Sequence, residues 1–174
     1  MTAPTAAVNF HLGYNADEDR LLLSVDVAGD REYAMALTRR LTKALVGALA
    51  DRVAKGRGNL GINPALRDTV LSFEHAHAVA DAQASGVRRP RSGQKPLFAA
   101  PRLVREIKLK SNEDGGVALQ LDDHERALNI ELNIERLHSF VAGILDIAGG
   151  AGWDLPPPVP WLERSTGTAP TILH

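Results

Sequence analysis

The sequence predicts an α+β domain of about six mainly antiparallel strands and three helices. Short segments that alternate apolar and polar residues indicate strands, and two amphipathic segments that begin after Thr38 and Asn133 indicate helices. Three strand-like segments precede each of these helices, so the order strand-strand-strand-helix occurs twice. We therefore expect an internal duplication with half-repeats 7–55 and 102–150, arranged as one continuous sheet or as two three-stranded halves.

Length and composition are those of one domain. The chain has 174 residues, 44% hydrophobic and 24% charged, and it has no cysteine. The lack of cysteine excludes disulfides, thiolate metal sites and thiol nucleophiles. The N-terminus has no secretory signal pattern, and no apolar segment approaches the roughly 20 residues that span a bilayer. We expect a cytoplasmic domain over residues 1–152 that does not contact a membrane, followed by a tail over residues 153–174.

The first half-repeat is predicted to form three strands and a helix. Strands are expected over residues 7–14, 21–27 and 32–37, because apolar positions alternate and turn residues separate the segments. Thr38 is a favourable N-cap, and apolar residues follow it at spacings of three and four as far as Val53.

A second helix and a basic linker are expected to join the halves. Asn63-Pro64 opens the helix, which extends over residues 63–82 with Leu66, Val70, Phe73 and His77 facing the core. The linker, residues 85–101, is rich in proline, glycine and arginine and has too little apolar content to pack.

The second half-repeat is predicted to repeat the first. Strands are expected over residues 103–110, 117–121 and 127–132, and Asn133 caps a helix that ends at the glycine pair 149–150.

Gly47 and Gly143 occupy matching places inside the first and last of these helices. Each costs about 0.5–1 kcal/mol relative to alanine. This match indicates that the two helices cross closely at these glycines; chance similarity between two amphipathic segments is the alternative.

The tail contains four prolines within Leu155–Trp161, which favour an extended polyproline course without a helix. We expect Trp153 and Trp161 to lie along the domain surface or against a partner.

Candidate chemistry is sparse. Glu74, His75, His77 and Asp81 form a cluster that could bind a metal or act in acid-base catalysis, but His75 and His77 are about 200° apart on a helix and cannot chelate one ion together. The favoured interpretation is that His77 lies at the edge of the core and pairs with a carboxylate.

The loop Gly56–Gly61 has the spacing of a dinucleotide fingerprint but follows a helix, so no cofactor is predicted. The acidic segment 122–125 could bind a cation weakly, but it also fits a solvated hairpin turn without an ion, and the turn is the favoured interpretation.

Cationic residues gather in two places. Arg39 and Arg40 lie in the first helical turn, where the macrodipole disfavours cations by about 0.3–1 kcal/mol each. Acidic turns at 17–19 and 122–125, solvent, or an anionic partner such as phosphate could offset this cost. The segment 88–110 holds a larger group, which is a solvated loop or binds an acidic protein or a nucleic-acid backbone; its members are Arg88, Arg89, Arg91, Lys95, Arg102, Arg105, Lys108 and Lys110.

The run Glu32–Arg40 followed by an apolar helix resembles a family of small bacterial hypothetical proteins that share a strand ending in Leu-Thr-Arg-Arg. The resemblance extends to Phe73-Glu74-His75, to Ala80-Asp81 and to the Leu137-His138 helix. It implies one complete domain, and it implies no activity because none is established for the family.

Taken together, the sequence favours a non-catalytic accessory subunit without a cofactor or metal. It would bind a protein partner, in a hetero-complex or a homo-oligomer, through the basic segment, the proline-rich tail, or both. A nucleic-acid-associated protein is the alternative, and an enzyme centred on Glu74, His75, His77 and Asp81 is the third. The expected partner-binding residues are Arg39, Arg40, Arg88, Arg89, Arg91, Lys95, Lys108, Lys110, Trp153 and Trp161.

Overall fold

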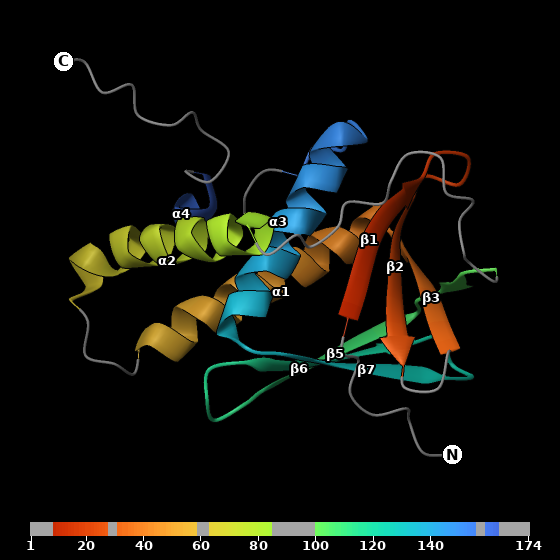
Figure 1. Cartoon of the computed structure of the whole chain (residues 1–174), viewed down its shortest axis with the longest axis horizontal. Coiled ribbons are helices and arrows are strands. Elements are labelled where there is room, and N and C mark those ends of the chain that lie inside the picture. Colours follow the sequence, from red (N-terminus) through yellow and green to blue (C-terminus); the bar gives the residue numbers. More distant parts are fainter. Residues whose placement is uncertain (1–8, 28–30, 59–62, 85–99, 156–158, 164–174) are drawn as a thin grey trace.

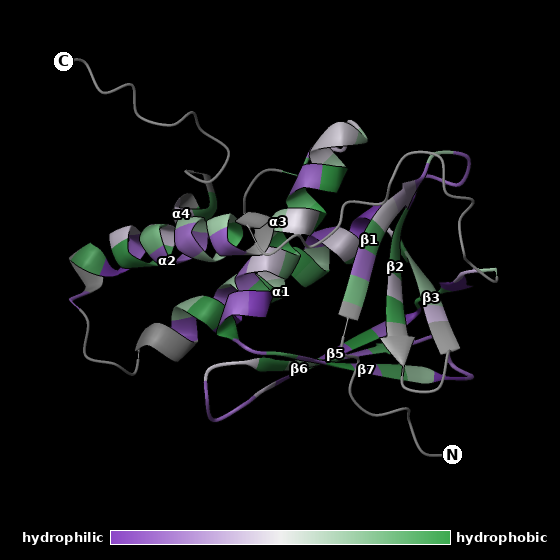
Figure 2. Ribbon diagram, in the orientation of Figure 1, coloured by the Kyte–Doolittle hydropathy of each residue, from purple (hydrophilic) through white to green (hydrophobic). Residues whose placement is uncertain are grey.

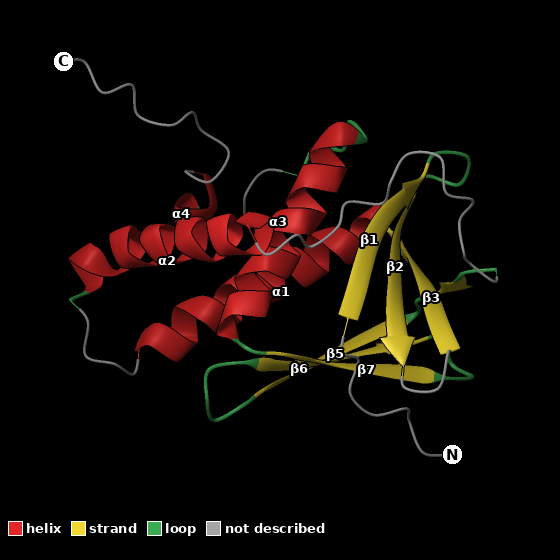
Figure 3. Ribbon diagram, viewed as in Figure 1, coloured by secondary structure: helices red, strands yellow, loops and turns green. Residues whose placement is uncertain are grey.

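The computed structural model describes residues 9–27, 31–58, 63–84, 100–155 and 159–163. Seven strands form two sheets, and the helices gather beside them (Figure 1, Figure 3). The predicted α+β class is confirmed. Among the described residues, no helix combines the length and apolar character needed to cross a membrane.

The first sheet is an antiparallel meander with one added strand. β1 (Asn9–Asn15), β2 (Arg20–Val27) and β3 (Arg31–Thr38) pair in sequence order, and β4 (Arg102–Leu103) pairs parallel to β3. Leu12, Leu23 and Met35 are directly opposite one another across β1, β2 and β3. They belong to the apolar face that packs into the core.

The second sheet is a three-stranded antiparallel meander. β5 (Glu106–Ser111), β6 (Val117–Asp122) and β7 (Ala127–Leu132) pair in sequence order. Side chains alternate along β6 and β7, and the buried ones face the core. The inner face consists of Ile107, Leu109, Val117, Leu119, Leu121, Leu128, Ile130 and Leu132.

The prediction of one strand over residues 103–110 is wrong, because the chain passes from one sheet to the other within it. The Val104 N–H donates to the Ala36 carbonyl at 2.9 Å, whereas the Arg105 N–H donates to the Asp122 carbonyl at 2.7 Å. Val104 is 1% exposed, so burial of its side chain holds this crossing point in the core.

Three long helices and one helical turn complete the fold: α1 (Arg39–Gly58), α2 (Pro64–Ala84), α3 (Ile134–Gly150) and α4 (Pro160–Glu163). Both predicted N-caps are confirmed. Thr38 Oγ1 accepts from the Leu41 N–H at 3.2 Å, and Asn133 Oδ1 accepts from the Arg136 N–H at 2.9 Å. Side chains from both sheets and from all four helices join one hydrophobic core.

The predicted glycine crossing is wrong. A Cβ added to Gly47 would have no atom within 4 Å, whereas a Cβ added to Gly143 would lie 2.9 Å from Leu12 Cδ1. Gly143 therefore allows α3 to approach β1, where Phe140 also packs edge-on against Phe10 with ring centroids 5.1 Å apart. The order of three strands and a helix does occur twice, but the duplication itself stays a prediction.

The predicted surface tail is also wrong where the structure describes it. Trp153 is 4% exposed and Trp161 is 2% exposed, and both belong to the core. Pro160 stands at the first position of α4, a place where proline favours a helix. Burial of an indole removes about 150–250 Å² from water, which favours Trp153 and Trp161 in the core over a position on the surface.

Candidate functional site

Hydrophobic and hydrophilic residues alternate along the visible side of helix α2 (Figure 2), and its apolar residues lie both on a buried and on an exposed face. Leu71, His75 and Ala78 face the core and are 0%, 0% and 8% exposed. The predicted inward stripe instead faces out, with Leu66 56% exposed and Phe73 74% exposed. That part of the prediction is wrong, because α3 and α4 pack against the opposite side of the helix.

A buried pair of imidazoles lies between α2 and α3. His75 Nδ1 lies 3.1 Å from His138 Nδ1 on α3, which allows a hydrogen bond when one of the two nitrogens is protonated. The Trp161 ring lies edge-on to both, with centroids 5.6 and 5.7 Å away. Burial lowers the pKa of His75 to about 4. These contacts join α2, α3 and α4.

The proposed acid-base cluster is not assembled on one surface. His77 Nδ1 lies 2.9 Å from Asp81 Oδ2, and both side chains are 67% exposed, while His75 lies on the buried face. The predicted pairing of His77 with a carboxylate is confirmed, but its position at the edge of the core is wrong. Among the residues that the structure describes, no three histidine or acidic side chains are grouped to hold a metal ion.

Arg39 is held by the first acidic turn. Its Nη2 donates to Asp19 Oδ2 at 3.1 Å, and its guanidinium carbon lies 5.3 Å from the centroid of the Trp153 ring. Asp19 Oδ1 also accepts from the Tyr14 hydroxyl at 2.7 Å and from Trp153 Nε1 at 2.6 Å. The hydrogen bonds from Tyr14 and Trp153, followed by the charge of Arg39, lower the pKa of Asp19 although partial burial opposes them. The interpretation of Arg39 as the partner of an acidic turn is confirmed, and Arg40 is exposed.

The second acidic turn binds a different arginine. Arg102 of β4 pairs with Asp123 and Glu125, which joins the first sheet to the β6–β7 turn. Burial raises the pKa of Asp123, but hydrogen bonds from the Arg126 backbone and the Arg102 side chain outweigh it and leave the pKa below its usual value. This segment is a turn, as predicted, and its buried carboxylate already has a cation.

Lys108 and Lys110 lie on the outer face of the second sheet. They border a hollow of about 300 Å³, and Lys108 Nζ also lies 3.2 Å from Glu106 Oε2. The remaining predicted contacts of the basic segment, Arg88, Arg89, Arg91 and Lys95, lie outside the described residues. The hollow is lined by Lys108, Leu109, Lys110, Ala118, Leu119, Gln120, Asn129 and Glu131.

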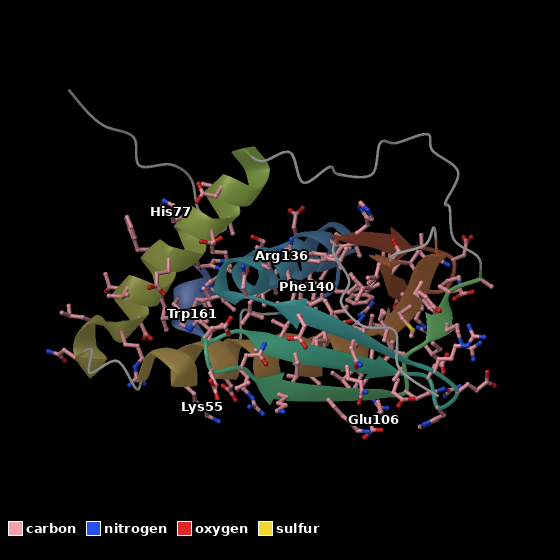
Figure 4. All side chains as sticks on the ribbon, turned by 60° about the horizontal axis from the view of Figure 1, so that its bottom comes forward. Lys55, His77, Glu106, Arg136, Phe140 and Trp161 are labelled. Carbon is pink, nitrogen blue, oxygen red and sulfur yellow. The ribbon has the colours of Figure 1, made fainter. Side chains whose placement is uncertain are left out.

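The outer face of α2 is the strongest candidate for a binding surface. Figure 4 shows this helix standing at the edge of the molecule, with His77 pointing away from the body and Trp161 beneath the helix. Leu66 and Phe73 are the exposed large hydrophobic side chains among the described residues. The spacing of the apolar residues predicted this stripe. Whether the stripe faces the core or the solvent depends on which face of α2 packs against α3 and α4.

Comparisons with known proteins gave no match to a protein-family model, a curated protein or a solved structure. The resemblance to small bacterial hypothetical proteins therefore stays a prediction.

Proposed function

We propose that this protein is a non-catalytic accessory subunit that binds a protein chain through the outer face of α2. The observation that carries the proposal is the exposure of Phe73 and Leu66, two turns apart on one helix, while the other large apolar side chains of the described residues are at least partly buried.

The exposed apolar side chains of α2 are in contact with water. Burial of a Leu or Phe side chain is worth about 1.5–3 kcal/mol, so an apolar stripe on a helix is favourable where another surface covers it. An exposed Leu alone is ordinary, but a contiguous apolar surface indicates an interaction site. The Leu66–Phe73 stripe lies on the side of α2 opposite to the buried Leu71 and His75. Helix α2 therefore has a second apolar face that a partner can cover.

The shape of this face suits another helix. Leu66, Val70, Phe73 and His77 follow one another at spacings of four, three and four residues, the pattern that lets one helix pack along a second. Thr69, Ala76 and Ala80 are exposed beside this stripe and are small, so a neighbouring helix could approach closely. A helical protein partner therefore fits better than an extended peptide.

The two other routes to a partner receive less support. Trp153 and Trp161 are buried and cannot supply the contact. Lys108 and Lys110 remain accessible to an acidic protein. A nucleic-acid partner is less favoured, because the hollow beside these lysines contains Glu131 and has no aromatic lining residue on which bases could stack.

Site-specific photocrosslinking tests the proposal. A benzophenone amino acid at position 73, in the full chain expressed in its native host, should yield a protein adduct. The matched control places the same group at Ala44, an exposed position on α1. Adducts at 73 that are no stronger than those at 44 would contradict a binding role for α2.

A further inference from the structure

We infer that the chain covering the outer face of α2 is the α2 helix of a second copy, packed antiparallel around a twofold axis near Phe73 and Glu74. This inference rests on the proposed function and names its partner. A twofold contact uses the same surface on both subunits, so each residue of the patch must meet a complement within that same patch.

The apolar residues satisfy this condition. Leu66 and Ala80 lie seven residues before and after Phe73, and seven residues are nearly two helical turns, so all three lie on the outer side. An antiparallel copy centred on Phe73 places the large Leu66 against the small Ala80 at each end. The two Phe73 rings meet at the centre.

The charged residues show the same symmetry. Arg67 and Asp81 lie seven residues before and after Glu74, along one edge of the apolar stripe. In an antiparallel pair this edge faces the same edge of the second copy, so Arg67 of each copy meets Asp81 of the other. Asp81 is 67% exposed and its bond to His77 uses one oxygen, which leaves acceptor capacity for an arginine.

A parallel pair lacks this complementarity. It would set the edge containing Arg67, Glu74 and Asp81 against the opposite edge, where Thr69 and Ala76 carry no charge. The antiparallel pair gains two opposite-charge contacts and has one unfavourable contact, Glu74 against Glu74 of the second copy. All three contacts lie at the same edge of the stripe, where water screens them alike, so the two favourable contacts exceed the one unfavourable contact. The charge pattern therefore favours an antiparallel over a parallel pair of copies, and its self-complementarity is what a twofold contact requires.

The first test measures the mass of the purified full chain by sedimentation velocity across a dilution series. We expect a dimer that dissociates on dilution, and Phe73→Glu should raise its Kd at least about hundredfold because two charges would be buried in the apolar contact. Phe73 is 74% exposed, so this variant should keep the circular dichroism spectrum of the parent. Ala44→Glu, with the same charge on an exposed part of α1, should leave the Kd unchanged. A wild-type monomer at the highest concentration, or a Phe73→Glu dimer of unchanged Kd, would overturn the inference.

The second test determines the register. Arg67→Glu and Asp81→Lys should each raise the dimer Kd about tenfold, since each places like charges opposite one another twice. An equimolar mixture of the two variants should recover the wild-type Kd. In the mixed dimer one contact joins the introduced glutamate to the introduced lysine, and the other joins the retained Asp81 to the retained Arg67. Glutamine variants at both positions should associate without this recovery. A mixture no tighter than either variant alone would exclude the antiparallel register.

These outcomes separate the inference from the proposed function. If the protein is monomeric and the crosslinker at position 73 captures a different protein, α2 is a binding surface but its partner is not a second copy. An adduct within one chain would mean that the chain itself covers the face. If position 73 captures nothing, both proposals fail.

Discussion

At the scale of the single residue, His75 should make stability depend on pH. Its pKa is lowered by burial from 6.5 to about 4, so between these values the unfolded chain binds a proton that the folded chain does not. Stability is therefore complete above pH 6.5 and is lost as the pH falls toward 4. We expect a loss of about 2 kcal/mol between pH 7 and pH 5, measured by urea denaturation.

Two variants identify the group responsible. His75→Phe should reduce the pH slope even if it lowers the overall stability, whereas His77→Asn, at a 67% exposed position on the same helix, should retain the slope. Asp19 and Asp123 have lowered pKa values and stay charged above pH 5, so they do not contribute in this interval. An equal slope in the wild type and in His75→Phe would show that another group is responsible.

At the scale of the element, α1 should become more stable when its internal glycine is replaced. A Cβ at Gly47 meets no atom within 4 Å, so Gly47→Ala gains helix propensity without a steric cost. We expect an increase of about 0.5–1 kcal/mol in the free energy of unfolding, measured by chemical denaturation.

Gly116 provides the contrasting case in the β5–β6 turn. A Cβ there would lie 2.5 Å from the Leu132 carbonyl oxygen, and a backbone atom cannot move away cheaply. Gly116→Ala should therefore destabilise the protein. If Gly47→Ala were destabilising as well, α1 would have a close neighbour at that position, as the crossing predicted from the sequence requires.

At the scale of the whole molecule, the segment after α3 closes the core. The chain has two tryptophans, and both Trp153 and Trp161 are buried. We expect blue-shifted emission that iodide quenches poorly in each single-tryptophan variant, Trp153→Phe and Trp161→Phe. Red-shifted, readily quenched emission from Trp161 in the Trp153→Phe variant would indicate that α4 is released from α2, and would contradict the structure.

The sequence by itself determined the local elements of this protein. Alternation predicted where strands occur, although not the change of sheet between Val104 and Arg105. The hydroxyl and amide of Thr38 and Asn133 predicted two helix starts that the structure confirms. These signals depend on neighbours within a few residues, so they do not require knowledge of the fold. The predicted hairpin turn at residues 122–125 is confirmed for the same reason.

The tertiary structure alone decided which apolar surfaces face inward. On α2, the stripe containing Phe73 and the side containing His75 both show the apolar spacing of a buried helix face. The side containing His75 faces inward because His75 contacts His138 and Trp161. Likewise, Trp153 packs into the core while Asp19, distant in the chain, accepts its indole N–H, which removes the cost of burying that donor unpaired. The direction of each face depends on contacts between residues far apart in the sequence. The spacing of apolar residues along one helix does not show which other element will pack against that helix.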